Sequence, residues 1–128
     1  MKEKHRPHIL IVEDNLDTIK LLDYQLRAYF QITLAMRIDE ALQLADRHRF
    51  DLFLLDINLG ERRTGIDLLE RLRQHAEHRN TPAIALTAYA LPGDRERFLE
   101  EGFEAYVSKP FLRDDLINTI RHVLAATA

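Results

Sequence analysis

Short aliphatic runs alternate with longer amphipathic segments along the chain, and this alternation constrains the fold more than any other feature of the sequence. The predicted strands are His8–Val12, Gln31–Ala35, Asp51–Asp56, Ala83–Thr87 and Ala105–Lys109. Such runs, separated by helical patterns, indicate βα units around a parallel sheet. The first, third and fourth runs are almost continuously apolar, which is typical of central strands covered on both faces. Gln31–Ala35 alternates in polarity, so we expect it at an edge.

Apolar residues spaced three and four apart predict a helix after each strand. The first three helices are marked by Leu16, Ile19, Leu22 and Leu26; by Ala41, Leu42 and Ala45; and by Leu68, Leu69, Leu72 and Ala76. Pro92 suits the first turn of a fourth helix through Phe98 and Leu99, with Gly102 as its left-handed C-cap. The fifth helix is marked by Leu116, Ile117, Ile120, Val123 and Leu124.

Length and charge narrow the class of protein further. A chain of 128 residues has an ordinary single-domain size, so we expect one domain, with residues 1–7 as a flexible N-terminal extension. Lys and Arg number 18 against 21 Asp and Glu, a net charge of −3, so no direct nucleic-acid partner is expected. The sequence has no cysteine and no apolar run of about 20 residues, which predicts a cytoplasmic protein without a membrane partner.

Polar side chains end, or directly follow, four of the predicted strands. Glu13 and Asp14 follow the first strand, Asp56 ends the third, Thr87 ends the fourth and Lys109 ends the fifth. Functional groups in an open parallel sheet collect beyond the carboxyl ends of the strands. We therefore expect three carboxylates, a hydroxyl and an ammonium to meet at one edge.

Three carboxylates that lie close together repel one another unless a cation sits among them. Lys109 supplies one positive charge, and an oxygen-rich site of this kind suits Mg²⁺ with several retained waters. With both cations present, the site could accept a phosphoryl group, and a carboxylate is a competent nucleophile for making an acyl phosphate. Asp56 is the predicted nucleophile because it ends the most apolar strand.

Each of these residues also has a structural interpretation when taken alone. Glu13 and Asp14 could cap the helix that follows, Asp56 could be a turn residue, and Thr87 could simply end a strand. Their placement on separate strand ends of the same edge favours a shared chemical role.

The other conspicuous polar residues are predicted to be solvated. The histidines are scattered along the sequence, and only His75 and His78 have helical spacing, with no matched carboxylate that would complete a metal site. The charged runs Arg71–Arg73 and Asp94–Arg97 are predicted to be solvated helix faces.

Four ordered motifs connect the predicted edge to a known family. They are ILIVEDN at 9–15, LLDINL at 54–59, ALTA at 85–88 and SKPF at 108–111. Together they resemble the receiver domain of two-component response regulators, over about residues 8–124. The resemblance implies a doubly wound, flavodoxin-like α/β fold: a five-stranded parallel sheet of order 2-1-3-4-5 with five helices.

The resemblance also implies roles for the strand-end residues. Asp56 would be the phosphoacceptor, and Asp14 and Asp56 would ligate Mg²⁺ directly. Glu13 would hold a metal-bound water, and the backbone carbonyl of Asn58 would be a further ligand.

Further residues would bind the phosphoryl group and respond to it. Thr87, Lys109 and the amide of Ala88 would bind its oxygens, and Tyr106 would rotate inward as Thr87 moves. Asn58 and Tyr89, two positions after the phosphoacceptor and the switch threonine, would control how fast the acyl phosphate is hydrolysed.

Two local features accompany the motifs. The family implies a cis peptide bond between Lys109 and Pro110. The segment Gly60–Gly65 departs from the family pattern, because Gly60 replaces a common proline and one extra residue precedes the next glycine. We expect this loop to be more mobile, with Arg62 and Arg63 exposed.

The resulting hypothesis is a stand-alone signalling switch that is not an enzyme in the ordinary sense. A histidine kinase or a histidine phosphotransfer protein would donate the phosphoryl group. A downstream protein would bind the face built from the fourth helix, the fifth strand and the fifth helix.

Three alternatives remain open from sequence. A phosphatase of the haloacid-dehalogenase type needs a second Asp two residues after its nucleophile, and the next acid after Asp14 is Asp17. A flavin-binding flavodoxin needs a polar phosphate loop after its first strand, where Glu13 and Asp14 would repel a phosphate. An interaction module could keep the fold without the switch, although the five strand-end residues are all present.

Overall fold

A parallel sheet forms the centre of the computed structural model, which describes residues 6–59, 64–88 and 92–127. Its strands are β1 (His8–Val12), β2 (Gln31–Ala35), β3 (Leu52–Asp56), β4 (Ala83–Thr87) and β5 (Ala105–Ser108). All neighbouring strands pair in parallel, in the order β2-β1-β3-β4-β5. The predicted fold class, strand order and edge position of β2 are confirmed.

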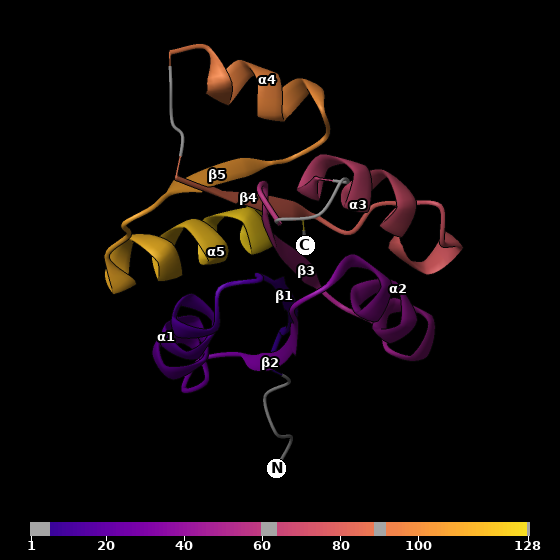
Figure 1. Cartoon of the computed structure of the whole chain (residues 1–128), viewed down its shortest axis with the longest axis horizontal. Coiled ribbons are helices and arrows are strands. Elements are labelled where there is room, and N and C mark those ends of the chain that lie inside the picture. Colours follow the sequence, from indigo (N-terminus) through magenta and orange to yellow (C-terminus); the bar gives the residue numbers. More distant parts are fainter. Residues whose placement is uncertain (1–5, 60–63, 89–91, 128) are drawn as a thin grey trace.

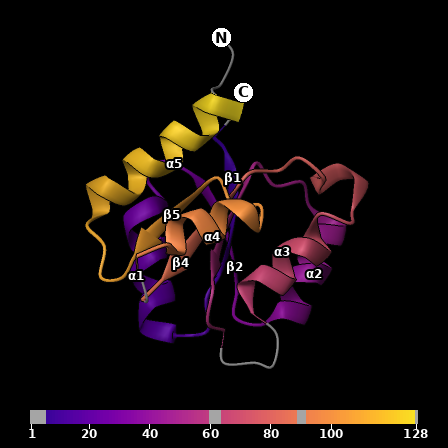
Figure 2. The same cartoon turned by 90° about the horizontal axis from the view of Figure 1, so that it is seen from above.

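Helices lie on both sides of this sheet. They are α1 (Leu16–Leu26), α2 (Ile38–Arg47), α3 (Gly65–Leu72), α4 (Asp94–Glu100) and α5 (Arg113–Thr127), with a 3-10 turn, η1, at Ala76–His78. Figure 1 shows α1 and α5 on one side of the sheet, α2 and α3 on the other, and α4 beyond the β5 edge. The view from above gives the same arrangement (Figure 2).

The core has two layers because successive strand residues point to opposite faces. Leu10, Phe53 and Leu55 pack against α2, α3 and Phe98 of α4. Ile9 and Leu54, the alternate positions, pack against α1 and α5. Every residue of β3 and β4 is buried, which explains why these strands read as continuous apolar runs.

Two predicted helix positions are wrong, and a third residue is in its predicted helix but is not buried. Ala76 does not extend α3, which ends at Leu72; it lies in η1 and is exposed. Leu16 begins α1 as predicted, but its side chain is 52% exposed. Pro92 precedes the fourth helix, which begins at Asp94 after the left-handed Gly93.

Of the residues predicted to be solvated, one is fully buried and another is partly buried. His78 is fully buried, and its Nε2 accepts a hydrogen bond from the Phe50 amide at 3.2 Å. Arg73 donates from Nη1 to the Gly102 carbonyl at 2.6 Å and from Nη2 to the Thr81 carbonyl at 2.8 Å. Both side chains are held by backbone groups outside their own helix or turn. Such contacts cannot be read from local sequence patterns.

The remaining local predictions have mixed outcomes. Gly102 has the predicted left-handed conformation, with φ of 103°, and Lys109–Pro110 is cis as expected. Residues 1–5 of the predicted extension lie outside the described residues, whereas Pro7 accepts a hydrogen bond from the Gln31 amide at 2.9 Å. The predicted exposure of Arg62 and Arg63 also falls outside them. No described helix is long and apolar enough to cross a membrane.

Candidate functional site

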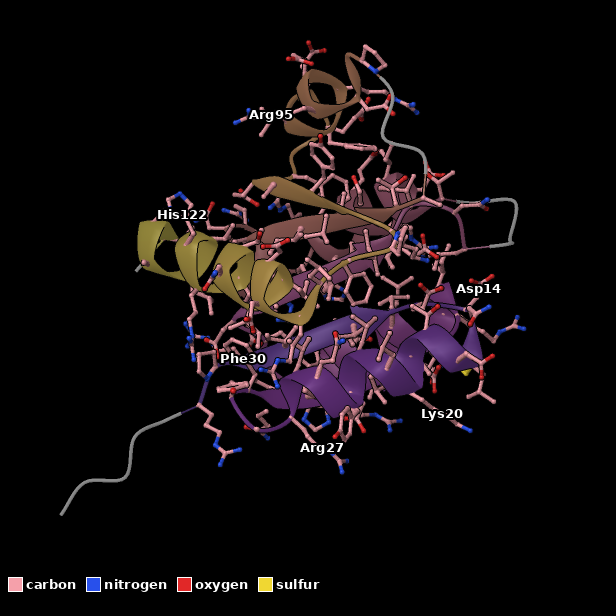
Figure 3. All side chains as sticks on the ribbon, turned by 90° about the vertical axis from the view of Figure 1, so that its left-hand side faces the viewer. Asp14, Lys20, Arg27, Phe30, Arg95 and His122 are labelled. Atoms are coloured by element: carbon pink, nitrogen blue, oxygen red, sulfur yellow. The ribbon has the colours of Figure 1, made fainter. Side chains whose placement is uncertain are left out.

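The predicted strand-end carboxylates meet at the carboxyl edge of the sheet. Oxygens of Glu13, Asp14 and Asp56 all lie within 4.8 Å of one another. β1 and β3 are hydrogen-bonded neighbours, which brings residues more than forty positions apart to the same edge. Glu13 is fully buried and Asp56 is 4% exposed, whereas Asp14 faces solvent. Figure 3 shows Asp14 at this end of the molecule.

Lys109 reaches the two buried carboxylates from the loop after β5. Its Nζ lies 2.5 Å from Glu13 Oε1 and 3.3 Å from Asp56 Oδ2. The Lys109 amide donates to the Thr87 carbonyl at 2.7 Å, which ties this loop to the end of β4. The Lys109 ammonium therefore bridges the ends of β1 and β3, and the Lys109 backbone is anchored to the end of β4.

Main-chain hydrogen bonds orient both buried carboxylates. The Asn15 amide donates to Glu13 Oε2 at 3.1 Å, so both Glu13 oxygens are engaged. The Asn58 amide donates to Asp56 Oδ1 at 3.1 Å, while Oδ2 faces Lys109. These contacts fix which oxygen of each carboxylate points into the site.

The electrostatics of the site indicate a deficit of positive charge. Burial and a hydrogen bond to Asp56 raise the pKa of Glu13 above its ordinary value, against the opposing effect of Lys109. Burial and the neighbouring Glu13 raise the pKa of Asp14. Burial favours the neutral amine of Lys109, but contacts with Glu13 and Asp56 outweigh it and raise the pKa of Lys109.

A cavity of about 440 Å³ opens at this cluster. Its described lining is Glu13, Asp14, Asn15, Thr18, Asp56, Asn58, Ala88 and Lys109. Asn15 and Thr18 were not predicted to line it, although Asn15 could have been found as the N-cap that accepts from the Thr18 amide. Thr87 is 3% exposed and ends β4 directly before Ala88.

Tyr106 lies on the same face of the sheet as Thr87 but farther from the cavity. It pairs in register with Ala85, two residues before Thr87, and its ring centroid is 5.9 Å from that of Phe98. It lines a second hollow, of about 650 Å³, between α4, β5 and α5. Tyr89 lies outside the described residues.

The donor set fits a hard divalent cation. Carboxylate and carbonyl oxygens are the ligands that Mg²⁺ prefers, and it usually keeps several waters when bound by few protein groups. Asp14 and Asp56 supply carboxylates to the cavity, and the raised pKa values of Glu13 and Asp14 show that added positive charge is favoured there.

The sequence matches a family model described as the response regulator receiver domain over residues 9–121. The chain belongs to the response regulator receiver family. Receiver domains of this family act as signalling switches, and the convergent strand-end residues of this receiver are consistent with a phosphoacceptor role.

Relatives and solved structures agree with this assignment. The receiver is 42% identical over 117 residues to the polar-differentiation response regulator DivK of Brucella anthropi, covering 91% of this chain and 94% of DivK. It is 41% identical, with the same coverage, to DivK of Brucella ovis.

Two solved structures share the fold closely. The chemotaxis protein CheY4 of Vibrio cholerae superposes with a TM-score of 0.86 at 25% identity, covering 92% of this chain and 98% of CheY4. The receiver domain of a sensor histidine kinase from Pseudomonas aeruginosa superposes with a TM-score of 0.83 at 34% identity, covering 94% and 98%. That structure has a magnesium ion coordinated in the active-site cleft.

Proposed function

We propose that this receiver accepts a phosphoryl group on Asp56 in a Mg²⁺-dependent step and thereby switches its affinity for a partner protein. The observation that carries the proposal is the convergence of Glu13, Asp14 and Asp56 within 4.8 Å, with Lys109 bridging the two buried carboxylates. A histidine kinase or a histidine phosphotransfer protein is the proposed donor, and the cytoplasm is the proposed compartment.

In the proposed step, a carboxylate oxygen of Asp56 attacks the phosphorus of a phosphohistidine. The new O–P bond forms as the P–N bond breaks, and the imidazole leaves with the electron pair of that bond and takes up a proton. Lys109 holds the Asp56 carboxylate in place from Oδ2 and offers its ammonium to the incoming oxygens. Thr87 and the amide of Ala88 would bind the other phosphoryl oxygens.

Asp14, Asp56 and the carbonyl of Asn58 would hold Mg²⁺, and Glu13 would hold one of its waters. Glu13 suits this indirect role because both of its oxygens already accept hydrogen bonds, from Lys109 and the Asn15 amide. The ion would supply positive charge that neutralises the approaching phosphoryl oxygens.

The proposed output is a change at the face formed by α4, β5 and α5. Thr87 and Tyr106 are on adjacent strands, and Tyr106 borders the 650 Å³ hollow in this face. Arg95 and His122 flank the same hollow, from α4 and α5 respectively (Figure 3). Movement of Thr87 toward the phosphate would let Tyr106 turn inward and reshape the surface.

Acetyl phosphate and Mg²⁺ test the chemistry directly. Intact mass spectrometry should show one added phosphoryl group on the wild-type protein and none on Asp56→Asn, because an amide is not a nucleophile. Asp17→Asn, which changes an exposed acid in the first turn of α1, is the matched control and should be labelled normally. Labelling of Asp56→Asn would place the acceptor elsewhere.

A further inference from the structure

The first residue of α3 lies directly against the main chain of Asp56. A Cβ atom on Gly65 would stand 2.3 Å from the Asp56 carbonyl oxygen, 3.0 Å from its carbonyl carbon and 3.2 Å from Ile57 Cα. Non-bonded heavy atoms pack at about 3.5–4.0 Å. Any side chain at Gly65 would therefore displace α3 or the Asp56 backbone by about 1 Å.

Hydrogen bonds hold the main chain of residues 56–58, against which Gly65 packs. The Ile57 amide donates to the Leu86 carbonyl at 2.9 Å, and the Gly65 amide donates to the Ile57 carbonyl at 3.0 Å. The Asn58 amide donates to Asp56 Oδ1 at 3.1 Å. The orientation of the phosphoacceptor carboxylate thus depends on main-chain atoms that Gly65 touches or binds.

The helix itself cannot easily move away from this segment. The Thr64 hydroxyl accepts from the amides of Ile66 and Asp67, and the Thr64 amide donates to the Asp67 carboxylate, which completes a capping box. Leu68 and Leu69 are buried in the core on the α2 and α3 side. The cap and the core both hold the start of α3 in place, so a clash at Gly65 would be transmitted to Asp56.

We propose that Gly65 is a positioning residue for phosphoryl transfer: its missing side chain lets α3 seat against Asp56 and hold the acceptor carboxylate at its attacking geometry. The inference rests on the proposed function of Asp56. The need for glycine at this position does not come from its backbone angles, because only Gly93 and Gly102 have positive φ among the described glycines. A conformationally permitted alanine at this helical position would normally stabilise a helix, by about 1 kcal/mol.

Gly65→Ala tests the proposal, with Gly102→Ala as the matched control. A Cβ on Gly102 would meet Arg73 Nη1 at 2.7 Å, and the Gly102 φ of 103° disfavours alanine. This control variant should therefore be less stable than the wild type, through a change far from the cavity. Three quantities are compared: the initial rate of labelling by acetyl phosphate at saturating Mg²⁺, the free energy of unfolding in urea, and the amide chemical shifts of Ile57 and Asn58.

The Gly65→Ala protein should be labelled on the order of 100-fold more slowly, the loss expected for a displacement near 1 Å, with shifted Ile57 and Asn58 resonances. Gly102→Ala should keep the wild-type rate and resonances although it is less stable. A Gly65→Ala rate equal to that of wild type, or a loss matched by Gly102→Ala, would overturn the inference while leaving the proposed function intact. Failure to label the wild type would instead overturn the proposed function.

A second variant covers the case in which Gly65→Ala does not fold. Thr64→Ala removes the hydroxyl that accepts from two amides of the first turn but adds no atom beside Asp56. Loosening the helix start should slow labelling and shift the Ile57 amide resonance. An unchanged labelling rate and unchanged resonances in this variant would overturn the positioning role.

Discussion

Both ends of the sheet bury polar groups, but they satisfy them differently. At the carboxyl end, Glu13 and Asp56 are paired with Lys109, so ionisable side chains hold one another. At the other end, the shortest contacts are to main-chain groups: the Phe50 amide for His78, and the carbonyls of Thr81 and Gly102 for Arg73, which also pairs with the Glu104 carboxylate at 3.3 Å.

This difference distinguishes the candidate functional site around Glu13 and Asp56 from the structural contacts of Arg73 and His78. A main-chain partner cannot change its charge, so the main-chain contacts of Arg73 and His78 create no demand for a further cation. Side-chain carboxylates with raised pKa values, such as Glu13 and Asp14, retain a demand for positive charge that a metal ion can meet. Substitutions near Arg73 and His78 should therefore lower the free energy of unfolding, whereas substitutions among the strand-end carboxylates should mainly affect metal binding and phosphorylation.

The largest effect on stability is expected for Arg73→Met. The change leaves the carbonyls of Thr81 and Gly102 without their donor and removes the ion pair to Glu104, 3.3 Å away. Urea denaturation should show a loss of about 2–4 kcal/mol in the free energy of unfolding, with labelling by acetyl phosphate retained. Arg71→Met, on the exposed side of α3, should change little. Equal stability of the two variants would remove the contrast between the ends of the sheet.

His78 should make stability depend on pH. Burial, with the nearby His75 and Arg49, lowers the pKa of His78 below its ordinary value of 6.5, against the opposing charge of Glu77. The unfolded chain therefore takes up a proton first as the pH falls. The contribution of His78 is complete above pH 6.5 and is lost as the pH falls through the lowered pKa, with a slope of at most about 1.4 kcal/mol per pH unit.

His78→Gln isolates this effect because the amide oxygen can still accept from the Phe50 amide but does not titrate. Urea denaturation at about pH 7.5 and about pH 5.5 should show a smaller pH dependence for His78→Gln than for the wild type. His122→Gln, an exposed control on α5, should follow the wild type. Parallel pH profiles for His78→Gln and the wild type would show that His78 does not titrate between these conditions.

A smaller effect of opposite sign is expected for Asp14→Asn. Burial and the Glu13 charge disfavour the ionised Asp14, so removing that charge should raise the stability of the metal-free protein. The gain should be less than about 1 kcal/mol because solvent screens this exposed group. Mg²⁺ should raise the melting temperature of the wild type but not of Asp14→Asn, measured by differential scanning fluorimetry. Undiminished Mg²⁺ stabilisation of the variant would mean that Asp14 is not a metal ligand.

The smallest change in stability is expected for substitutions of Asn58 and Tyr89, which should alter only the rate at which the acyl phosphate is hydrolysed. On the proposed function, Asn58 would hydrogen-bond a water that attacks the acyl phosphate, and Tyr89, which lies outside the described residues, would exclude that water. Asn58→Ala should lengthen the phosphoryl lifetime and Tyr89→Ala should shorten it, followed by loss of label after the donor is removed. Unchanged decay in both variants would transfer control of water access to the Gly60–Gly65 loop.

Sequence patterns predicted the strands well because burial on both faces leaves a simple signal. β3 and β4 are apolar throughout, and their ends fall within one residue of the predicted ends. Patterns failed where contacts are distant. The buried His78 accepts from the Phe50 amide, 28 residues away, and the partly buried Arg73 donates to the Gly102 carbonyl, 29 residues away. Helix periodicity likewise missed the end of α3 at Leu72, after which Ala76 belongs to a separate turn.

The site was predictable because parallel strands bring their carboxyl ends together. Glu13, Asp14 and Asp56 could be placed at one edge of the sheet from their positions at the carboxyl ends of predicted strands, but the contact of Gly65 with Asp56 could not be predicted. No sequence signal distinguishes a glycine required by a neighbouring carbonyl from one required by its own backbone angles. That distinction depends on how closely α3 approaches β3.

The bridge from Lys109 to Glu13 spans 96 positions of the chain. During synthesis, the first four strands can emerge and pair before Lys109 leaves the ribosome, since domains begin to fold from their N-terminal side. Asp56 would by then be in place, yet its ammonium partner would be missing. If Asp56 is the phosphoacceptor as proposed, we expect a nascent or truncated chain to be a poor acceptor, so that signalling would require the last strand to have docked.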